Sequence, residues 1–178
     1  KAAGVPFVIA NIESSEMIKY ASNGFLATKI TFVNEIAELC ERVGADVEVV
    51  ARGMGLDSRI NPRFLHPGPG YGGSCFPKDT SAIAQIAEEH GMNFEIIDAV
   101  LSANERVRLR MVPKIETAFG GLAGKTVALL GLAFKGDTDD MRESPAIPIV
   151  EGLVKAGARV RAYDPAAAEQ ARPLLPPI

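Results

Sequence analysis

Hydrophobic residues recur at helical spacing over most of the first two thirds of the chain. From Glu13 to about Arg42 this spacing predicts one helix. It is long for a globular helix and too irregular for a coiled coil, so we interpret it as a connector that also packs against another subunit. Gly44 is a typical helix end. Asp46 can cap a second, short helix over Val47–Met54, which Gly55 would terminate.

Two further helices are predicted, one that ends at His90 and one over residues 94–119. The segment Asp57–Pro77 is rich in glycine and proline, and an ordered loop of this length is more often functional than not. After it, Asp79–Thr80 is expected to cap a helix that runs to His90. Residues 94–119 form another long helical pattern, which Pro113 is expected to bend.

The pattern changes after a turn at Gly120–Gly121. Residues 126–130 have the continuous apolar character of a buried parallel strand, residues 144–155 that of a helix, and residues 159–163 that of a second strand. This is a βαβ unit, expected to be right-handed and to belong to a larger doubly wound sheet. The predicted fold class is a mainly α central domain followed by part of an α/β Rossmann-like domain with a parallel sheet.

These elements divide the chain into three parts. Residues 1–10 are expected to be the remnant of a preceding domain. Within them, the short apolar stretch 6–10 is predicted to be a buried strand. Residues 11–120 are the predicted helical central and dimerisation domain. Residues 121–178 are the predicted start of the α/β domain, which we expect to continue further because two strands do not make a stable sheet alone.

Composition and charge exclude several classes of protein. The chain has 178 residues, of which 47% are hydrophobic and 23% charged, as in ordinary globular proteins. A net charge of -3 gives no general attraction to nucleic acid or to an anionic membrane. We expect no transmembrane span and no signal peptide. Cys40 and Cys75 have neither zinc-site spacing nor the number needed for a disulfide framework, so no metal is expected, and a free thiol fits a cytoplasmic location.

The loop Gly70–Asp79 carries the most chemistry. Cys75 directly follows two glycines and a serine, and glycines let a backbone come close to a ligand. Lys78 would favour the thiolate, the reactive form of cysteine. Asp79 is a candidate general base. The alternative is a glycine-rich turn with a structural cysteine, but few structural needs would fix all these residue types together.

Three segments resemble the UDP-glucose 6-dehydrogenase and GDP-mannose 6-dehydrogenase family: the loop 70–79, the segment 131–145 and the helical segment 19–23. They stand in the family's order and spacing, and the resemblance covers about residues 13–165. It implies NAD as the cofactor. No G-x-G-x-x-G follows a strand in this sequence, so the resemblance places the main NAD site in a preceding N-terminal domain.

The resemblance implies a four-electron oxidation of a nucleotide sugar, in which a primary alcohol becomes a carboxylate. Cys75 matches the family's nucleophile, which forms a thiohemiacetal and then a thioester. Lys19 and Asn23 match residues that stabilise charge on the reacting oxygen or help order the hydrolytic water, although on their own they would be interpreted as a polar helix face. Asp79 matches an aspartate that assists proton transfer and water activation, and it is also a candidate helix cap.

Other residues match the family's ligand sites. Arg142 is assigned to the phosphates of the bound nucleotides, and Cys75 is expected to lie beside the cofactor. Arg59 is assigned to the substrate of the neighbouring subunit. This last assignment implies a homodimer. Lys135 is assigned to the sugar nucleotide, although it and Arg142 would otherwise be read as surface charges. The predicted substrate residues are Arg59, Phe64, Leu65, Tyr71, Gly72, Gly73, Phe134 and Lys135.

UDP-glucose is the preferred substrate, and UDP-glucuronate the expected product. GDP-mannose or another nucleotide sugar is the alternative within the family. A second alternative is that the chain as it stands is a non-catalytic module that binds a nucleotide sugar and dimerises. We expect negligible turnover from the chain alone, because the family's main cofactor site has no counterpart in it.

Overall fold

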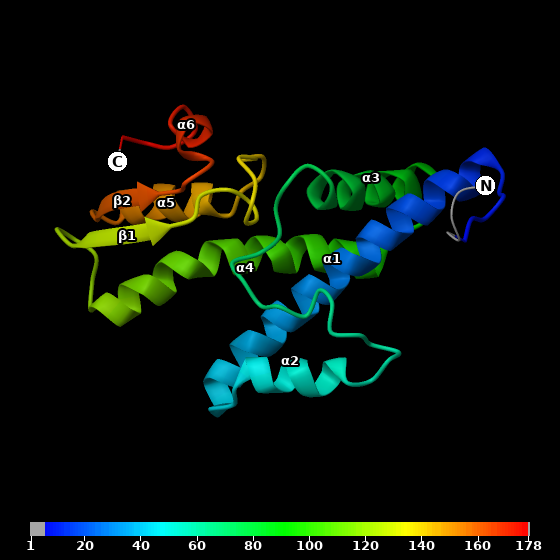
Figure 1. Cartoon of the computed structure of the whole chain (residues 1–178), viewed down its shortest axis with the longest axis horizontal. Helices are drawn as coiled ribbons and strands as arrows, with labels where there is room; N and C mark the ends of the chain where they lie inside the picture. Colours follow the sequence, from blue (N-terminus) through cyan, green and yellow to red (C-terminus); the bar gives the residue numbers. More distant parts are fainter. Residues whose placement is uncertain (1–5, 178) are drawn as a thin grey trace.

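The computed structural model describes residues 6–177. A helical part is followed by a small α/β part, and the strands lie near the C-terminal end of the long helix α4 (Figure 1). In chain order the elements are α1 Ile12–Val43, α2 Val47–Gly55, α3 Phe76–Glu89, α4 Glu95–Phe119, β1 Thr126–Leu130, α5 Ala146–Lys155, β2 Arg159–Tyr163 and α6 Ala168–Ala171. The predicted fold class is confirmed, because a mainly helical part precedes a parallel βαβ unit.

The first helix follows its sequence signals closely. The side chain of Asn11 accepts a hydrogen bond from the backbone N–H of Ser14, which caps α1 at its N-terminus. Gly44 ends α1 in the left-handed conformation, with φ at 74°. Asp46 caps α2 as predicted, accepting from the N–H of Glu48 at 2.8 Å, and α2 continues through Gly55 rather than stopping there.

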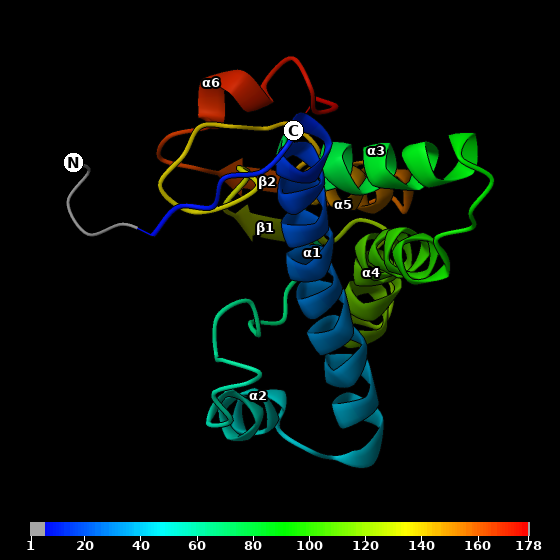
Figure 2. The ribbon, with the colours of Figure 1, turned by 90° about the vertical axis from the view of Figure 1, so that its right-hand side faces the viewer.

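Helix α1 is the axis of the helical part. Helices α3 and α4 pack against it, with α3 crossing its N-terminal half, whereas α2 lies at its C-terminal end (Figure 2). Ala27 of α1, Tyr71 of the loop and Val100 of α4 form a buried cluster between them. Three ion pairs follow the α1–α4 contact: Glu35 with Arg106, Glu38 with Arg110 and Glu41 with Lys114.

The α/β part is built on one parallel strand pair. Strands β1 and β2 run in register from Thr126 opposite Arg159 to Leu130 opposite Tyr163. Helix α5 covers them through a core that includes Val150 and Leu153, both fully buried. Helix α4 joins this core, since a β-carbon added at Gly152 of α5 would lie 2.6 Å from the side chain of Val112. The α/β part is therefore docked directly on the end of α4.

Two expectations need correction, and one short helix was not predicted. Residues 6–10 are not a strand in the described structure, and Phe7, Val8 and Ile9 are at least 80% exposed, because no described strand lies beside them. Helix α3 begins at Phe76, so Asp79 does not cap it. The short helix α6 was not predicted in the alanine- and proline-rich tail. Within the described residues, none of the helices combines the length and apolarity that crossing a membrane requires.

Candidate active site

Cys75 stands at the start of α3 with its thiol exposed. It occupies the N-cap position, and no side chain caps this end of the helix. Pro77 in the first turn suits a helix start, because proline lacks the N–H that would be unpaired there. Ser74 Oγ lies 3.7 Å from Cys75 Sγ. The thiol therefore lies at the positive end of the dipole of α3.

A buried carboxylate lies one turn into the same helix. The side chain of Asp79 is fully buried, and its Oδ2 accepts a hydrogen bond of 2.6 Å from Asn23 Nδ2. Lys19 Nζ lies 3.3 Å from the same oxygen, and Lys78 Nζ donates to Oδ1. Lys19 and Asn23 are four residues apart on one face of α1. The structure thus brings together three of the four predicted catalytic residues, with Cys75 four positions before Asp79.

The charges in this cluster stabilise one another. Burial raises the pKa of Asp79, but hydrogen bonds from Lys78, Asn23 and Lys19 outweigh burial and hold this pKa below its ordinary value. The hydrogen bond to Asp79 in turn raises the pKa of Lys78. At neutral pH, Asp79 is therefore ionised and Lys78 protonated. A carboxylate held this way is a weak base, but it fixes the positions of the lysine and amide donors around it.

Two glycines let the cysteine loop lie directly against the α/β part. A β-carbon at Gly72 would come within 2.1 Å of the backbone oxygen of Glu143. At Gly73, where φ is 82°, it would come within 2.6 Å of the Phe134 ring. The N–H of Gly73 also donates to the carbonyl of Arg142 at 2.9 Å. Any side chain at Gly72 would force the two segments apart.

A pocket of about 490 Å³ lies beside this contact. Phe76 forms edge-to-face contacts with two aromatic rings of the loop, Phe64 at 6.1 Å and Tyr71 at 6.0 Å between centroids. Asn34 contributes a buried Nδ2 that has no hydrogen-bond partner in the described part of the chain. Five of the predicted substrate residues line this pocket: Phe64, Tyr71, Gly72, Phe134 and Lys135. Aromatic walls with a few polar groups are typical of sites for organic ligands.

Arg142 lines a second pocket, of about 530 Å³, together with Gly73 and Lys78. Its guanidinium forms a two-point ion pair with Asp140, with one N–O distance of 2.7 Å. This pairing lowers the pKa of Asp140 to about 2 and raises the pKa of Arg142. Two cations therefore line one pocket together with Ser74, the neighbour of Cys75, an arrangement that suits an anionic ligand.

Asn104 was missed in the sequence. It lies buried on α4, accepts the backbone N–H of Tyr71 at 2.9 Å and donates to the carbonyl of Tyr71 at 3.2 Å. This two-point contact fixes the loop two residues before Gly73. An asparagine among the apolar positions of a helical pattern was the available signal, because a buried amide needs hydrogen-bond partners.

Asp164 lies directly after β2. Its Oδ2 accepts the N–H groups of Leu132 and Ala133, and its Oδ1 accepts those of Ala166 and Ala167. These four backbone donors hold the pKa of Asp164 far below its ordinary range. Asp164 thereby fixes the start of the segment that carries Phe134 and Lys135.

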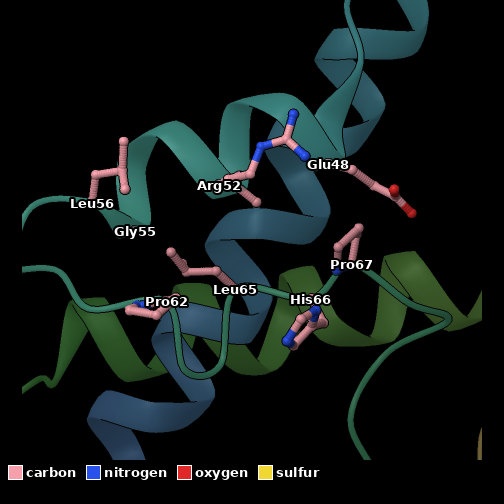
Figure 3. A pocket seen from close by; sticks show the side chains of 9 residues that line it. Glu48, Arg52, Gly55, Leu56, Pro62, Leu65, His66 and Pro67 are labelled. Carbon is pink, nitrogen blue, oxygen red and sulfur yellow. The ribbon is translucent and has the colours of Figure 1, made fainter.

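Two predicted substrate residues lie apart from the pocket beside Cys75. The guanidinium of Arg59 is exposed and paired with Asp57 at 2.6 Å. Leu65 is buried and lines a different cavity, of about 600 Å³, between α2 and the loop. Figure 3 shows this cavity with Arg52 of α2 above Leu65 and His66. His66 lines both cavities, which places the loop between them.

Comparison with solved structures gives the class of protein. A UDP-glucose dehydrogenase from the hyperthermophilic archaeon Pyrobaculum islandicum matches with a TM-score of 0.92 and 43% identity, covering 97% of this chain and 40% of that one. A UDP-D-ManNAc dehydrogenase from Pyrococcus horikoshii matches with a TM-score of 0.76 and 33% identity, covering 88% of this chain and 37% of that one. The fold of this chain thus matches part of the fold of these nucleotide-sugar dehydrogenases.

The family follows from the sequence comparison. Residues 13–106 match the central domain of the UDP-glucose/GDP-mannose dehydrogenase family, and residues 128–176 match its UDP binding domain. The chain belongs to this family. It is 54% identical over 170 residues to UDP-glucose 6-dehydrogenase TuaD of Bacillus subtilis (strain 168), and 53% identical over 171 residues to UDP-glucose 6-dehydrogenase of Rhizobium meliloti (strain 1021). The matches cover 96% of this chain but only 37% and 39% of these relatives.

Proposed function

We propose that the chain supplies the nucleophile and the nucleotide-sugar site of an NAD-dependent UDP-glucose 6-dehydrogenase. The observation that carries the proposal is the exposed Cys75 at the start of α3, one turn before a buried carboxylate that binds Lys19 and Asn23. The names of the similar bacterial proteins support UDP-glucose as the substrate. The whole enzyme would convert UDP-glucose to UDP-glucuronate.

The proposed division of labour follows the fold. Residues 11–120 form a central domain that carries the cysteine, and residues 121–178 begin a UDP-sugar-binding domain. The two family matches, which end and begin on either side of residue 120, support this division. Residues 1–10 would then connect to an NAD-binding domain. An exposed free thiol persists in a reducing environment, which supports a cytoplasmic location.

The proposed chemistry uses the thiol in the second half of the reaction. The first oxidation removes a hydride and a proton from the primary alcohol and leaves an aldehyde. Cys75 Sγ then bonds to the aldehyde carbon, and the carbonyl oxygen takes up a proton to give a thiohemiacetal. Loss of a second hydride and of the hydroxyl proton gives a thioester. Water adds to the thioester, the C–S bond breaks, and the carboxylate and the free thiol result.

Lys19 and Asn23 would act on the reacting oxygen. Both groups are fixed by hydrogen bonds or ion pairs to Asp79, so they need little reorganisation when negative charge develops. The side chain of Lys19 is 59% exposed, which leaves part of its ammonium open to a ligand. Asp79 would chiefly hold these donors in place. Because its pKa is lowered, Asp79 is a weak base for taking a proton from water. Holding the donors in place is therefore the more favourable of its two expected roles.

The residues present fit a contribution to cofactor binding. NAD would supply the hydride acceptor for both oxidations. Arg142 and Lys78 place two positive charges in one pocket next to Cys75, and a guanidinium suits a phosphate. The aromatic pocket that Lys135 lines would hold the nucleotide sugar. Cys75 would thus lie between the sugar and the cofactor.

A homodimer through α1 is part of the proposal. Four large apolar residues lie seven positions apart along this helix, so they form one stripe. Their exposed fractions in the single chain are 52% for Ile18, 67% for Phe25, 49% for Phe32 and 54% for Leu39. An exposed apolar stripe of this length is typical of an interface. Arg59 is exposed and lies outside the pocket beside Cys75. In a dimer, Arg59 would reach the neighbouring subunit.

The test is Cys75→Ser in the whole enzyme, measured as glucuronate formed from UDP-glucose and NAD. A hydroxyl at this position is a far weaker nucleophile, so product formation should fall by several orders of magnitude. Ser74→Ala is the matched control and should retain most of the activity. If the Cys75→Ser enzyme formed glucuronate at the normal rate, Cys75 would not be the nucleophile. The chain of 178 residues alone should give no measurable NADH, and turnover by it would refute the proposed division of labour.

A further inference from the structure

The loop between α2 and α3 carries most of the proposed nucleotide-sugar residues, yet it contains no regular secondary structure. Such a loop keeps one shape only if its backbone groups find partners. Side chains of the two long helices supply them. Asn34 of α1 accepts the N–H of Gly68 at 2.7 Å, and Asn104 of α4 binds Tyr71 at both its backbone groups. The N-terminal half of the loop depends on a different residue.

Lys29 of α1 binds the N-terminal half of the loop. Its ammonium donates to three backbone carbonyls, those of Ile60 at 2.8 Å, Asn61 at 3.1 Å and Arg63 at 2.6 Å. An ammonium has three N–H donors, so all are used on this one loop. Asn61 has a φ of 66°, a left-handed conformation that few non-glycine residues adopt. The lysine thus stabilises a turn that the backbone alone would not favour.

The same turn sets the position of two proposed substrate residues. Arg59 directly precedes Ile60, and Phe64 directly follows Arg63, so each adjoins a carbonyl that Lys29 holds. Phe64 also has a positive φ, of 64°, and its ring contacts Phe76, the neighbour of Cys75. Residues 60–64 therefore connect the ammonium of Lys29 with Phe64, an aromatic residue that lines the pocket beside the thiol.

We propose that Lys29 is a positioning residue for the nucleotide sugar: it fixes residues 60–64 so that Phe64 lines the pocket and Arg59 is presented to the ligand. This inference rests on the proposed function. Lys29 itself need not touch the ligand, since its three donors are already occupied. Its loss should free the loop and weaken binding while the rest of the fold persists.

The experiment compares Lys29→Met, which keeps the apolar stem, with Lys29→Arg, which keeps a charged donor. Lys114→Met is the matched control, because Lys114 is also a lysine of a long helix but pairs with Glu41 away from the loop. Hydrogen exchange is measured on the amides of Ile60, Asn61 and Leu65, which have partners within the loop. Their exchange should quicken in Lys29→Met, whereas that of Tyr71 should not change.

Calorimetric titration with UDP-glucose on the same variants gives the second readout. The dissociation constant should rise about tenfold in Lys29→Met, because binding would then have to order the freed loop, and recover in Lys29→Arg. It should stay at the wild-type value in Lys114→Met. Unchanged exchange in the loop, or unchanged affinity in Lys29→Met, would overturn the proposal. If the wild-type chain gave no heat with UDP-glucose, the binding role would fail with the proposed function, and exchange alone would decide whether Lys29 orders the loop.

Discussion

Replacing Asp79 with asparagine removes the charge at the centre of the cluster while keeping its shape. The two carboxylate oxygens accept from three donors, namely Asn23, Lys19 and Lys78. An asparagine has one oxygen and an amino group, so at least one donor would lose its acceptor and face another donor. The site is fully buried at Asp79, and water cannot replace the lost partner there.

The expected cost is about 2 kcal/mol of unfolding free energy at pH 7, the central value for a hydrogen bond to a charged group. A larger figure is not expected, because the side chains of Lys19 and Lys78 are 59% and 61% exposed and are partly screened by solvent. For a chain of this size the melting temperature should fall by roughly 4–8 °C. Urea unfolding followed by circular dichroism measures the change.

The effect should depend on pH in a defined direction. Folding lowers the pKa of Asp79, so the charge of Asp79 stabilises the folded state at pH values above its unfolded pKa of about 3.9. This stabilisation is lost as the pH falls through the pKa of the folded state. The difference between wild type and Asp79→Asn should therefore shrink in acid. Asp57→Asn, which breaks an exposed pair, should have no measurable effect at pH 7. Equal stability of wild type and Asp79→Asn at pH 7 would refute the reasoning.

Three more changes test other parts of the structure. Gly72→Ala should abolish UDP-glucose binding in calorimetry, because its β-carbon would overlap the Glu143 carbonyl; binding at wild-type affinity would show that the loop contact does not matter. Phe25→Asp, in the exposed stripe of α1, should convert a dimer to a monomer in sedimentation analysis, and an unchanged mass would refute the proposed interface. Iodoacetamide should alkylate exposed Cys75 at least tenfold faster than buried Cys40 by mass spectrometry, and equal rates would contradict their assignment.

Elements with strong local signals could be predicted closely from the sequence. Helix α1 extends one residue beyond each end of the predicted range, because Asn11 and Gly44 cap it locally. Both strands have the predicted bounds, since their apolar runs lie between turns. The start of α3 was predicted too late, because Asp79 is a common helix cap and only its tertiary partners show that it has another role.

The site could be predicted residue by residue only where a motif resembled the family. Asn23 and Asp79 are 56 positions apart, and their hydrogen bond depends on how α1 packs on α3. The roles of Lys29, Asn104 and Asp164 are to bind backbone groups of loops, and such contacts have no sequence period. The expected strand at 6–10 failed for a related reason, because a strand needs a partner and the described chain offers none.

The central claim is that these residues contain a nucleotide-sugar site next to a nucleophilic cysteine. Calorimetric titration of the chain with UDP-glucose and, side by side, with GDP-mannose tests it most directly. The account predicts saturable binding of UDP-glucose at one site per chain, with much weaker binding of GDP-mannose. Preference for GDP-mannose would contradict the proposed substrate, and heat from neither ligand would contradict the claim that the pocket beside Cys75 forms a site within this chain.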